Sequence, residues 1–207
     1  MKPICIMILF SFFLGMACVQ NPESSASSEM PYPVIPDLIG ERIVADSLGF
    51  SLFAPKDWNP VDRGSRTEYQ LHLQDQAHPD ARFFRKPLVL YVKGANQSTL
   101  TVSQVSAQKD MTLSQLASEM EKYARYDQGG KKLKRCLYRK GGVFIEHLFK
   151  EDLLRVVNTL MFINRHGNAI EIEYTTLKSE YETESGGINS SMGSLQPEAE
   201  KNSAGNR

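Results

Sequence analysis

Four extended segments separated by short turns fill the chain between positions 133 and 176, and they restrict its fold more than any other feature. The turns have two to five residues, too few for a crossover connection, so neighbouring strands must be antiparallel. The sequence therefore predicts a meander with strands over 133–139, 143–150, 153–163 and 169–176. In the last strand, apolar and acidic residues alternate, which is typical of a strand with one buried face. The apolar residues are Ile170, Ile172 and Tyr174, with Glu171 and Glu173 between them.

A helix is predicted directly before the meander, over 113–126, because apolar residues recur there at steps of three and four. Thr112 and Gln115 have the spacing of a capping box, and Met111 and Leu116 have the spacing of a hydrophobic staple. Local patterns therefore define the start of this helix independently of its apolar face.

A second helix is predicted after the meander, over 180–195. Ser179 and Glu182 form a candidate capping box. The pair Gly186-Gly187 weakens the prediction, since each glycine costs about 1 kcal/mol in a helix interior.

Short strands are also predicted in the first half of the chain, and the stretch 74–87 is polar and ambiguous. Strands and helices in this order indicate an α+β fold, an antiparallel β-sheet meander flanked by helices. The predicted early strands cover 42–45, 50–54, 69–73, 88–92 and 99–107.

The N-terminus has the features of an export signal: Lys2, an apolar run, and small residues before Cys18. The segment Leu14-Gly15-Met16-Ala17-Cys18 resembles the lipobox of bacterial lipoproteins, although Gly15 stands where leucine is usual. An ordinary signal cut near Ala17 and an uncleaved membrane anchor are the alternatives. The apolar run falls short of the roughly 20 residues that a spanning helix needs.

Lipidation of Cys18 is the favoured interpretation, and it implies a diacylglyceryl thioether with palmitate-type chains. About two acyl chains suffice for stable membrane attachment. Val19 is not the aspartate that retains Gram-negative lipoproteins on the inner membrane, so the expected location is the cell envelope, with the outer membrane favoured.

These patterns divide the chain into four parts. We expect a lipoprotein signal peptide over 1–17, a flexible tether over 18–36, one α+β domain over 37–195 and a polar tail over 196–207.

Charge and cysteine content exclude some classes of function. Basic and acidic residues both number 24, so the chain has no electrostatic footprint for nucleic acid. If Cys5 leaves with the signal and Cys18 carries lipid, Cys136 has no disulfide partner and is expected to be a buried apolar residue.

No stretch has a catalytic or zinc-binding motif, and no cofactor is expected. For Asp75, His78 and Asp80, a solvated polar loop is the favoured interpretation, and a loop that binds a divalent ion is the alternative. Trp58 is a candidate binding anchor, with core packing favoured. A basic cluster is interpreted as a solvated edge, with contact to anionic lipid as the alternative. Its members are Lys131, Lys132, Lys134, Arg135, Arg139 and Lys140.

Residues 49–58, Gly-Phe-Ser-Leu-Phe-Ala-Pro-Lys-Asp-Trp, resemble the opening strand, proline and tryptophan of PsbP-like domains. The order of elements and the segment 181–195 are similar to the rest of that fold, so the resemblance covers about 40–195. It implies a PsbP-like α/β/α sandwich. The group includes a photosystem II extrinsic subunit, a Ran-binding nuclear protein and many bacterial lipoproteins, and its members are mostly non-catalytic.

The sequence thus predicts a lipid-anchored envelope protein with a binding or assembly role and a protein partner. The alternative is a carrier that holds a small or lipophilic ligand between sheet and helices. An envelope enzyme is the third hypothesis, and it requires a cleft that gathers titratable groups.

Overall fold

The computed structural model describes residues 28–45, 48–62, 64–68, 81–94, 98–107, 111–126 and 132–198. The predicted signal peptide, the first ten residues of the tether and the strand predicted over 69–73 lie outside the described residues.

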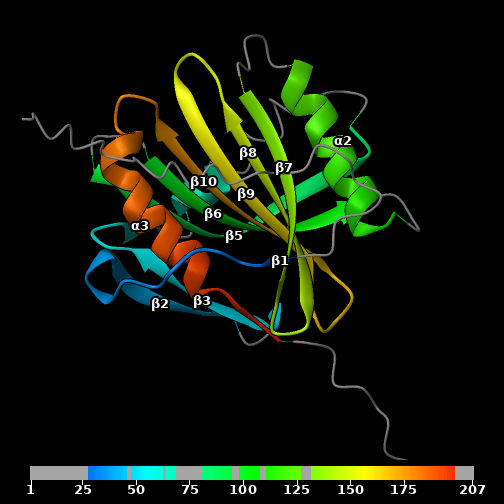
Figure 1. Ribbon diagram of the computed structural model, residues 1–207, viewed down its shortest axis with the longest axis horizontal. Helices are drawn as coiled ribbons and strands as arrows, with labels where there is room; N and C mark the ends of the chain where they lie inside the picture. Colours follow the sequence, from blue (N-terminus) through cyan, green and yellow to red (C-terminus); the bar gives the residue numbers. More distant parts are fainter. Residues whose placement is uncertain are drawn as a thin grey trace, which may run out of the picture.

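An eight-stranded mixed sheet forms the centre of the fold (Figure 1). Its strands, in the order in which they pair, are β1 (Ser28–Glu29), β7 (Lys132–Lys140), β8 (Val143–Glu151), β9 (Arg155–Ile163), β10 (Ala169–Leu177), β6 (Ser98–Ala107), β5 (Phe83–Lys93) and β4 (Asn59–Pro60). The predicted meander is therefore confirmed as four consecutive neighbours, β7 to β10. β1 is parallel to β7, and every other described pair in this sheet is antiparallel.

Different layers cover the two faces of this sheet (Figure 1). α2 (Leu113–Tyr126) packs on one face, which we call the outer face. The other face packs against α3 (Tyr181–Ser194) and a three-stranded sheet of β11 (Gln196–Pro197), β3 (Phe50–Pro55) and β2 (Ile39–Ala45). The layers are those of an α+β sandwich, as the sequence predicted.

Two apolar cores result, because side chains alternate between the faces of every strand. The larger core lies under α3 and contains Ile170, Ile172 and Tyr174 of β10 together with Ile188 and Met192 of α3. The smaller core lies under α2, where Leu116 and Met120 meet Met161 of β9.

Trp58 belongs to the larger core, and only 4% of it is exposed. Its ring packs edge-on against Tyr174, and its Nε1 donates a hydrogen bond of 3.3 Å to Glu184 of α3. Core packing, the favoured interpretation of Trp58, is thus confirmed.

Residues 28–38 form an N-terminal strap that crosses α3 and the edge of β7. The strap contains β1 and the short 3-10 helix η1 (Pro36–Leu38). The backbone N–H of Ile35 donates to Ser190 Oγ at 2.8 Å, and Ser190 Oγ donates to the carbonyl of Pro33. The hydroxyl group of Ser190 on α3 thus bonds the backbone of this proline-rich segment, most of which lies in the predicted tether over 18–36.

The sequence predicts the N-terminal cap of α2 correctly and that of α3 incorrectly. At α2, Thr112 N–H donates to Gln115 Oε1 at 2.8 Å and Gln115 N–H donates to Thr112 Oγ1 at 3.2 Å, so the capping box is confirmed. At α3, the N-cap is Glu180, without a side-chain cap, so the capping box of Ser179 and Glu182 is wrong.

Glycines inside α3 are explained by the strap. A Cβ at Gly193 would lie 2.3 Å from the carbonyl oxygen of Tyr32, closer than any real contact. A Cβ at Gly186 would lie 3.2 Å from a methyl group of Leu38, which is the end of a flexible side chain. Glycine lowers the helix propensity at these positions, but its lack of a side chain allows close contact between α3 and the strap.

Gly193→Ala and Gly186→Ala form a matched pair that tests this contact. Both changes should favour the helix by about 1 kcal/mol. Only Gly193→Ala forces backbone atoms apart, so we expect it to lower the free energy of unfolding by about 1–3 kcal/mol. Gly186→Ala should be close to neutral. Urea unfolding of both variants measures the difference, and equal stabilities would contradict the close approach of strap and helix.

Candidate functional site: the outer face of the sheet

Charged side chains lie on the outer face at the centre of the sheet. They are not part of the apolar core that α2 covers on this face. Glu171 of β10 is only 1% exposed. Its two carboxylate oxygens accept hydrogen bonds from Arg85 of β5, at 2.6 and 2.9 Å. A buried carboxylate needs such a partner, because removal of an ion from water costs several kcal/mol.

Glu173 follows Glu171 on the same face, two residues further along β10. Burial and then the negative charge of Glu171 raise the pKa of Glu173, while Arg85 and Lys150 oppose this rise. Two carboxyl groups near one guanidinium make this area acidic, with a carboxyl group that gains a proton more readily than usual.

A second buried ion pair joins the outer face to α2. Arg135 of β7 donates two hydrogen bonds of 2.9 Å to Glu146 of β8, which is 4% exposed. The same guanidinium donates to the hydroxyl groups of Ser114 and Ser118 on α2, each at 2.8 Å. Glu146 raises the pKa of Arg135 through this hydrogen bond and charge. The pair therefore positions the start of α2 on the sheet.

Three large apolar side chains on the outer face are exposed to solvent. Leu137, Phe144 and Ile163 are exposed by 36, 51 and 38%. The strand register places them together, since Phe144 is opposite Arg139 and Leu137 is opposite Glu146. Glu146 in turn is opposite Met161, two residues before Ile163. We call these three residues the outer patch. The guanidinium of Arg139 lies 5.8 Å from the centre of the Phe144 ring and adds a positive charge beside it.

The opposite face carries a buried polar cluster around His147. Glu146 and His147 point to opposite faces, as the alternation of the strand predicted. His147 Nε2 contacts Asn158 Oδ1 at 3.2 Å, and its Nδ1 contacts the hydroxyl of Tyr32 at 3.2 Å. Because an amide oxygen can only accept, Nε2 carries the proton and Nδ1 accepts from Tyr32. The cluster therefore ties the N-terminal strap to the sheet.

Burial lowers the pKa of His147 to about 4, against the smaller opposing effect of Asn158. Burial also raises the pKa of Tyr32. The amide of Asn158 faces the hydroxyl of Tyr181 and lowers its pKa against a larger rise from burial. Yet Asn158 Nδ2 makes no hydrogen bond of normal geometry within the described part of the chain. The cluster is therefore structural, because nearly all of its hydrogen-bonding groups have partners within the fold.

Several residues that the sequence singled out lie outside the described residues, namely Cys18, Asp75, His78, Asp80 and Lys131. The rest of the basic cluster is divided between two faces and several contacts. Lys140 donates to the carbonyl of Gly193, while Lys132 lies 5.6 Å from the ring of Phe149. Among described residues, no group of three His, Cys, Asp or Glu side chains is arranged to hold a metal, and no helix is long and apolar enough to cross a membrane.

Cys136 is disulfide-bonded, so the expectation that it has no partner is wrong. Cys136 lies on β7 two residues before Tyr138, which is opposite Ser28 of β1 in the N-terminal strap. The other cysteines, Cys5 and Cys18, lie outside the described residues. A cysteine that carries a lipid thioether has no thiol for a disulfide, so the state of Cys136 becomes a test of lipidation.

The sequence missed the two ion pairs of the outer face. It identified Glu171 and Glu173 as the non-core side of β10, but Arg85 falls in the stretch 74–87 that had no clear pattern. The available signal was the presence of glutamates on the predicted strand over 169–176, since a charged residue that becomes buried requires a partner of opposite charge.

The pKa of His147 predicts how stability depends on pH. The unfolded chain binds a proton at His147 below about pH 6.5, and the folded domain does so only below about pH 4. Stability should therefore fall as the pH decreases from 6.5 to 4, by on the order of 3 kcal/mol. His147→Gln should remove most of this dependence, and His166→Gln, in an exposed turn, should leave it unchanged. Urea unfolding between pH 4 and 7.5 measures both; an unchanged slope in His147→Gln would refute the assignment.

Comparison with known proteins adds to this geometry. No family model matches the sequence, and no curated protein matches it either. Among solved structures, the solution structure of cyanobacterial PsbP (CyanoP) from Synechocystis sp. PCC 6803 is similar with a TM-score of 0.51 and 14% identity. The match covers 86% of this chain and 99% of that one. The crystal structure of LpqN, involved in cell envelope biogenesis of Mycobacterium tuberculosis, has a TM-score of 0.47 and 13% identity over 76% of this chain and 84% of that one.

CyanoP shares the fold over most of this chain at low identity, which establishes the architecture and nothing about activity. The resemblance that the sequence showed at residues 49–58 is thus matched by the arrangement of the sheets and helices. The fold of this chain is a PsbP-like α+β fold.

Proposed function

We propose that the chain is a non-catalytic binding or assembly domain of the cell envelope, held at a membrane by lipid on Cys18. The outer patch is the observation that carries the binding role. It places Phe144, half of whose surface is exposed, on a rigid sheet between two apolar neighbours. Exposed apolar side chains that gather in this way mark interaction sites, and aromatic side chains dominate the energy of such sites.

The surroundings of the outer patch define the chemistry of its partner. The guanidinium of Arg139 lies beside the ring of Phe144. A protein surface with an apolar centre and acidic residues at its rim would match this arrangement. The ion pairs beside the patch keep the sheet rigid, which limits the entropy lost on binding.

The packing of the interior favours binding at a surface over the carrier hypothesis. The described space between the eight-stranded sheet and α3 is filled by fully buried side chains, including Phe162, Tyr174 and Ile188. The three-stranded sheet adds Phe50 and Leu52 to the same core. A lipophilic ligand in this space would have to displace side chains that are already close-packed.

Membrane attachment through Cys18 is tested by two linked measurements. Cys18→Ala should move the protein from the membrane fraction to the soluble fraction, because the acyl chains supply the attachment. Acylation of Cys18 and removal of Cys5 with the signal would leave Cys136 as the one free thiol of the denatured chain, whereas a disulfide between Cys136 and Cys18 would leave no free thiol and no site for the lipid. Mass spectrometry of the N-terminal peptide and thiol labelling under denaturing conditions provide the readout. An unacylated Cys18 with no free thiol on the chain would exclude the anchor.

The binding role is tested with a photo-crosslinking phenylalanine analogue placed at Phe144 and, as the control, at Val44. Val44 has similar exposure, 54%, but lies on the three-stranded sheet. In envelope preparations, position 144 should capture a defined protein that position 44 does not. Ile163→Ser should reduce this capture, since it removes part of the apolar surface. Identical products from both positions, or no effect of Ile163→Ser, would contradict the outer patch as the binding surface.

A further inference from the structure

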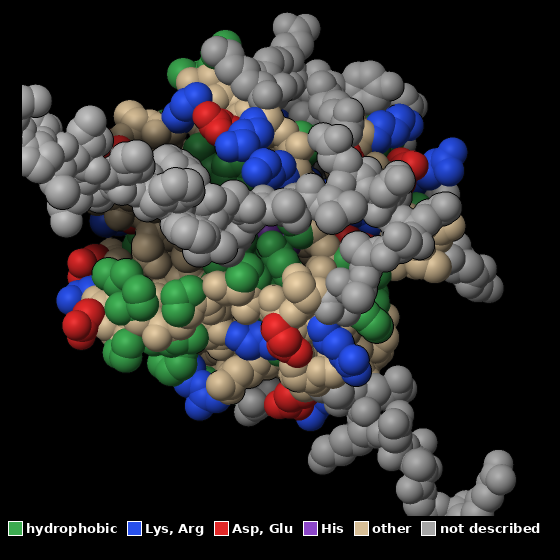
Figure 2. Space-filling view, viewed as in Figure 1, with side chains coloured by type: hydrophobic (Ala, Val, Ile, Leu, Met, Phe, Trp, Pro, Cys, Tyr) green, Lys and Arg blue, Asp and Glu red, His purple; other side chains and the backbone are tan. Residues whose placement is uncertain are grey.

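The turn between β8 and β9 carries the two most exposed large apolar side chains among the described residues. Leu153 is 61% exposed and Leu154 is 73% exposed. They are adjacent in sequence and lie at the end of the sheet, where Figure 2 shows hydrophobic side chains at the upper end with lysine and arginine side chains below them. We call residues 152–155 the β8–β9 tip.

Hydrogen bonds hold the backbone of the β8–β9 tip in place. Asp152 Oδ1 accepts from the N–H groups of Leu154 at 2.8 Å and Arg155 at 2.7 Å. The N–H of Lys178 donates to the carbonyl of Leu154 at 2.7 Å. Because the backbone groups are bonded, the two leucines are presented to solvent by a fixed turn. Their exposure is therefore a property of the fold.

The charges around the tip favour an anionic surface. Four basic residues lie within a few positions of it on neighbouring strands and turns. They are Lys132, Lys150, Arg155 and Lys178. The nearby acids are Glu151, Asp152 and Glu180. Glu151 forms an ion pair with Lys178 at 2.6 Å, so this pair adds no net charge. The other three basic residues outnumber the other two acids, of which Asp152 caps the turn.

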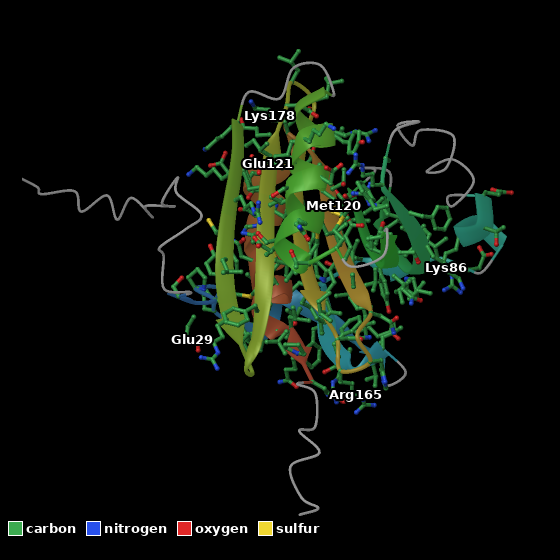
Figure 3. The ribbon with its side chains drawn as sticks, turned by 90° about the vertical axis from the view of Figure 1, so that its right-hand side faces the viewer. Glu29, Lys86, Met120, Glu121, Arg165 and Lys178 are labelled. Atoms are coloured by element: carbon green, nitrogen blue, oxygen red, sulfur yellow. The ribbon has the colours of Figure 1, made fainter. Side chains whose placement is uncertain are left out.

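We propose that the β8–β9 tip inserts Leu153 and Leu154 into the interface of an anionic lipid bilayer, as a second membrane contact beside the anchor. Apolar side chains enter the boundary between head groups and acyl chains, and basic residues around them contact anionic head groups. This inference rests on the proposed envelope location. It also orients the domain: in Figure 3, Lys178 lies at the tip end and Arg165 at the opposite end, so Arg165 faces away from the bilayer.

The test uses the full chain, purified from membranes and reconstituted into vesicles with brominated acyl chains, which quench tryptophan in the bilayer. Leu154→Trp places a probe at the tip, and Val44→Trp places one at the opposite end, near Gly49 and Arg165. The natural chain corrects for Trp58, which is buried. In anionic vesicles, the added emission at position 154 should be largely lost and that at position 44 retained. Zwitterionic vesicles should weaken the loss at position 154.

Sedimentation with the vesicles separates the two proposals. A chain that sediments but shows equal quenching at both positions, or none at position 154, overturns the tip contact and leaves the anchor standing. That result would favour an apolar pocket of a protein as the site of the leucines. A chain that stays in the supernatant contradicts the anchor. Excess anionic vesicles then still decide the tip, because quenching at position 154 and not at position 44 upholds it and its absence refutes it.

Discussion

The strict alternation of side chains along β10 is the constraint on which the rest of the molecule depends. One face of this central strand gives Ile170, Ile172 and Tyr174 to the larger core. The other face gives Glu171 and Glu173 to the outer face. A shift of the register by one residue would bury both glutamates under α3 and expose the core, so only one pairing is stable. The alternation therefore makes one side of the sheet structural and leaves the other for ion pairs and contacts.

The outer patch and the β8–β9 tip, the two surfaces that we propose for function, lie at opposite ends of the sheet. The outer patch lies toward the turn of β7 and β8, where Gly141 is close to Pro197. The β8–β9 tip lies at the other end of the same strands. A domain with its tip against a bilayer would hold Phe144 away from the lipid. The two proposals thus describe one orientation, in which the membrane contact and the protein contact do not compete.

Sequence patterns predicted the parts of the fold that local chemistry decides. The meander, α2 and its capping box, and the opposite orientations of Glu146 and His147 follow from alternation, helical periodicity and cap spacing. The strap and β11 were not predicted, because contacts between distant residues decide them. Ile35 bonds to Ser190, and the tight approach of Tyr32 requires Gly193. The glycines that lowered the helical propensity are those that admit the strap.

The ion pairs of the candidate site were also not predictable from local sequence patterns. Arg85 and Glu171 are far apart in sequence, and only the pairing of β5, β6 and β10 brings them together. The outer patch likewise needs the register of three strands. The disulfide of Cys136 was not predicted, because removal of Cys5 with a signal and acylation of Cys18 would leave Cys136 without a cysteine partner.

Closure of the N-terminal strap over α3 has a consequence for the order in which the domain folds while the chain is synthesised. Residues near Ile35 emerge early, but Ser190 and Gly193, which hold them, are among the last residues of the domain to be made. Contacts so distant along the chain form slowly, since a long loop must close first. The beginning of the domain must therefore remain unpaired until synthesis is almost complete, which makes it the natural segment for a chaperone to shield.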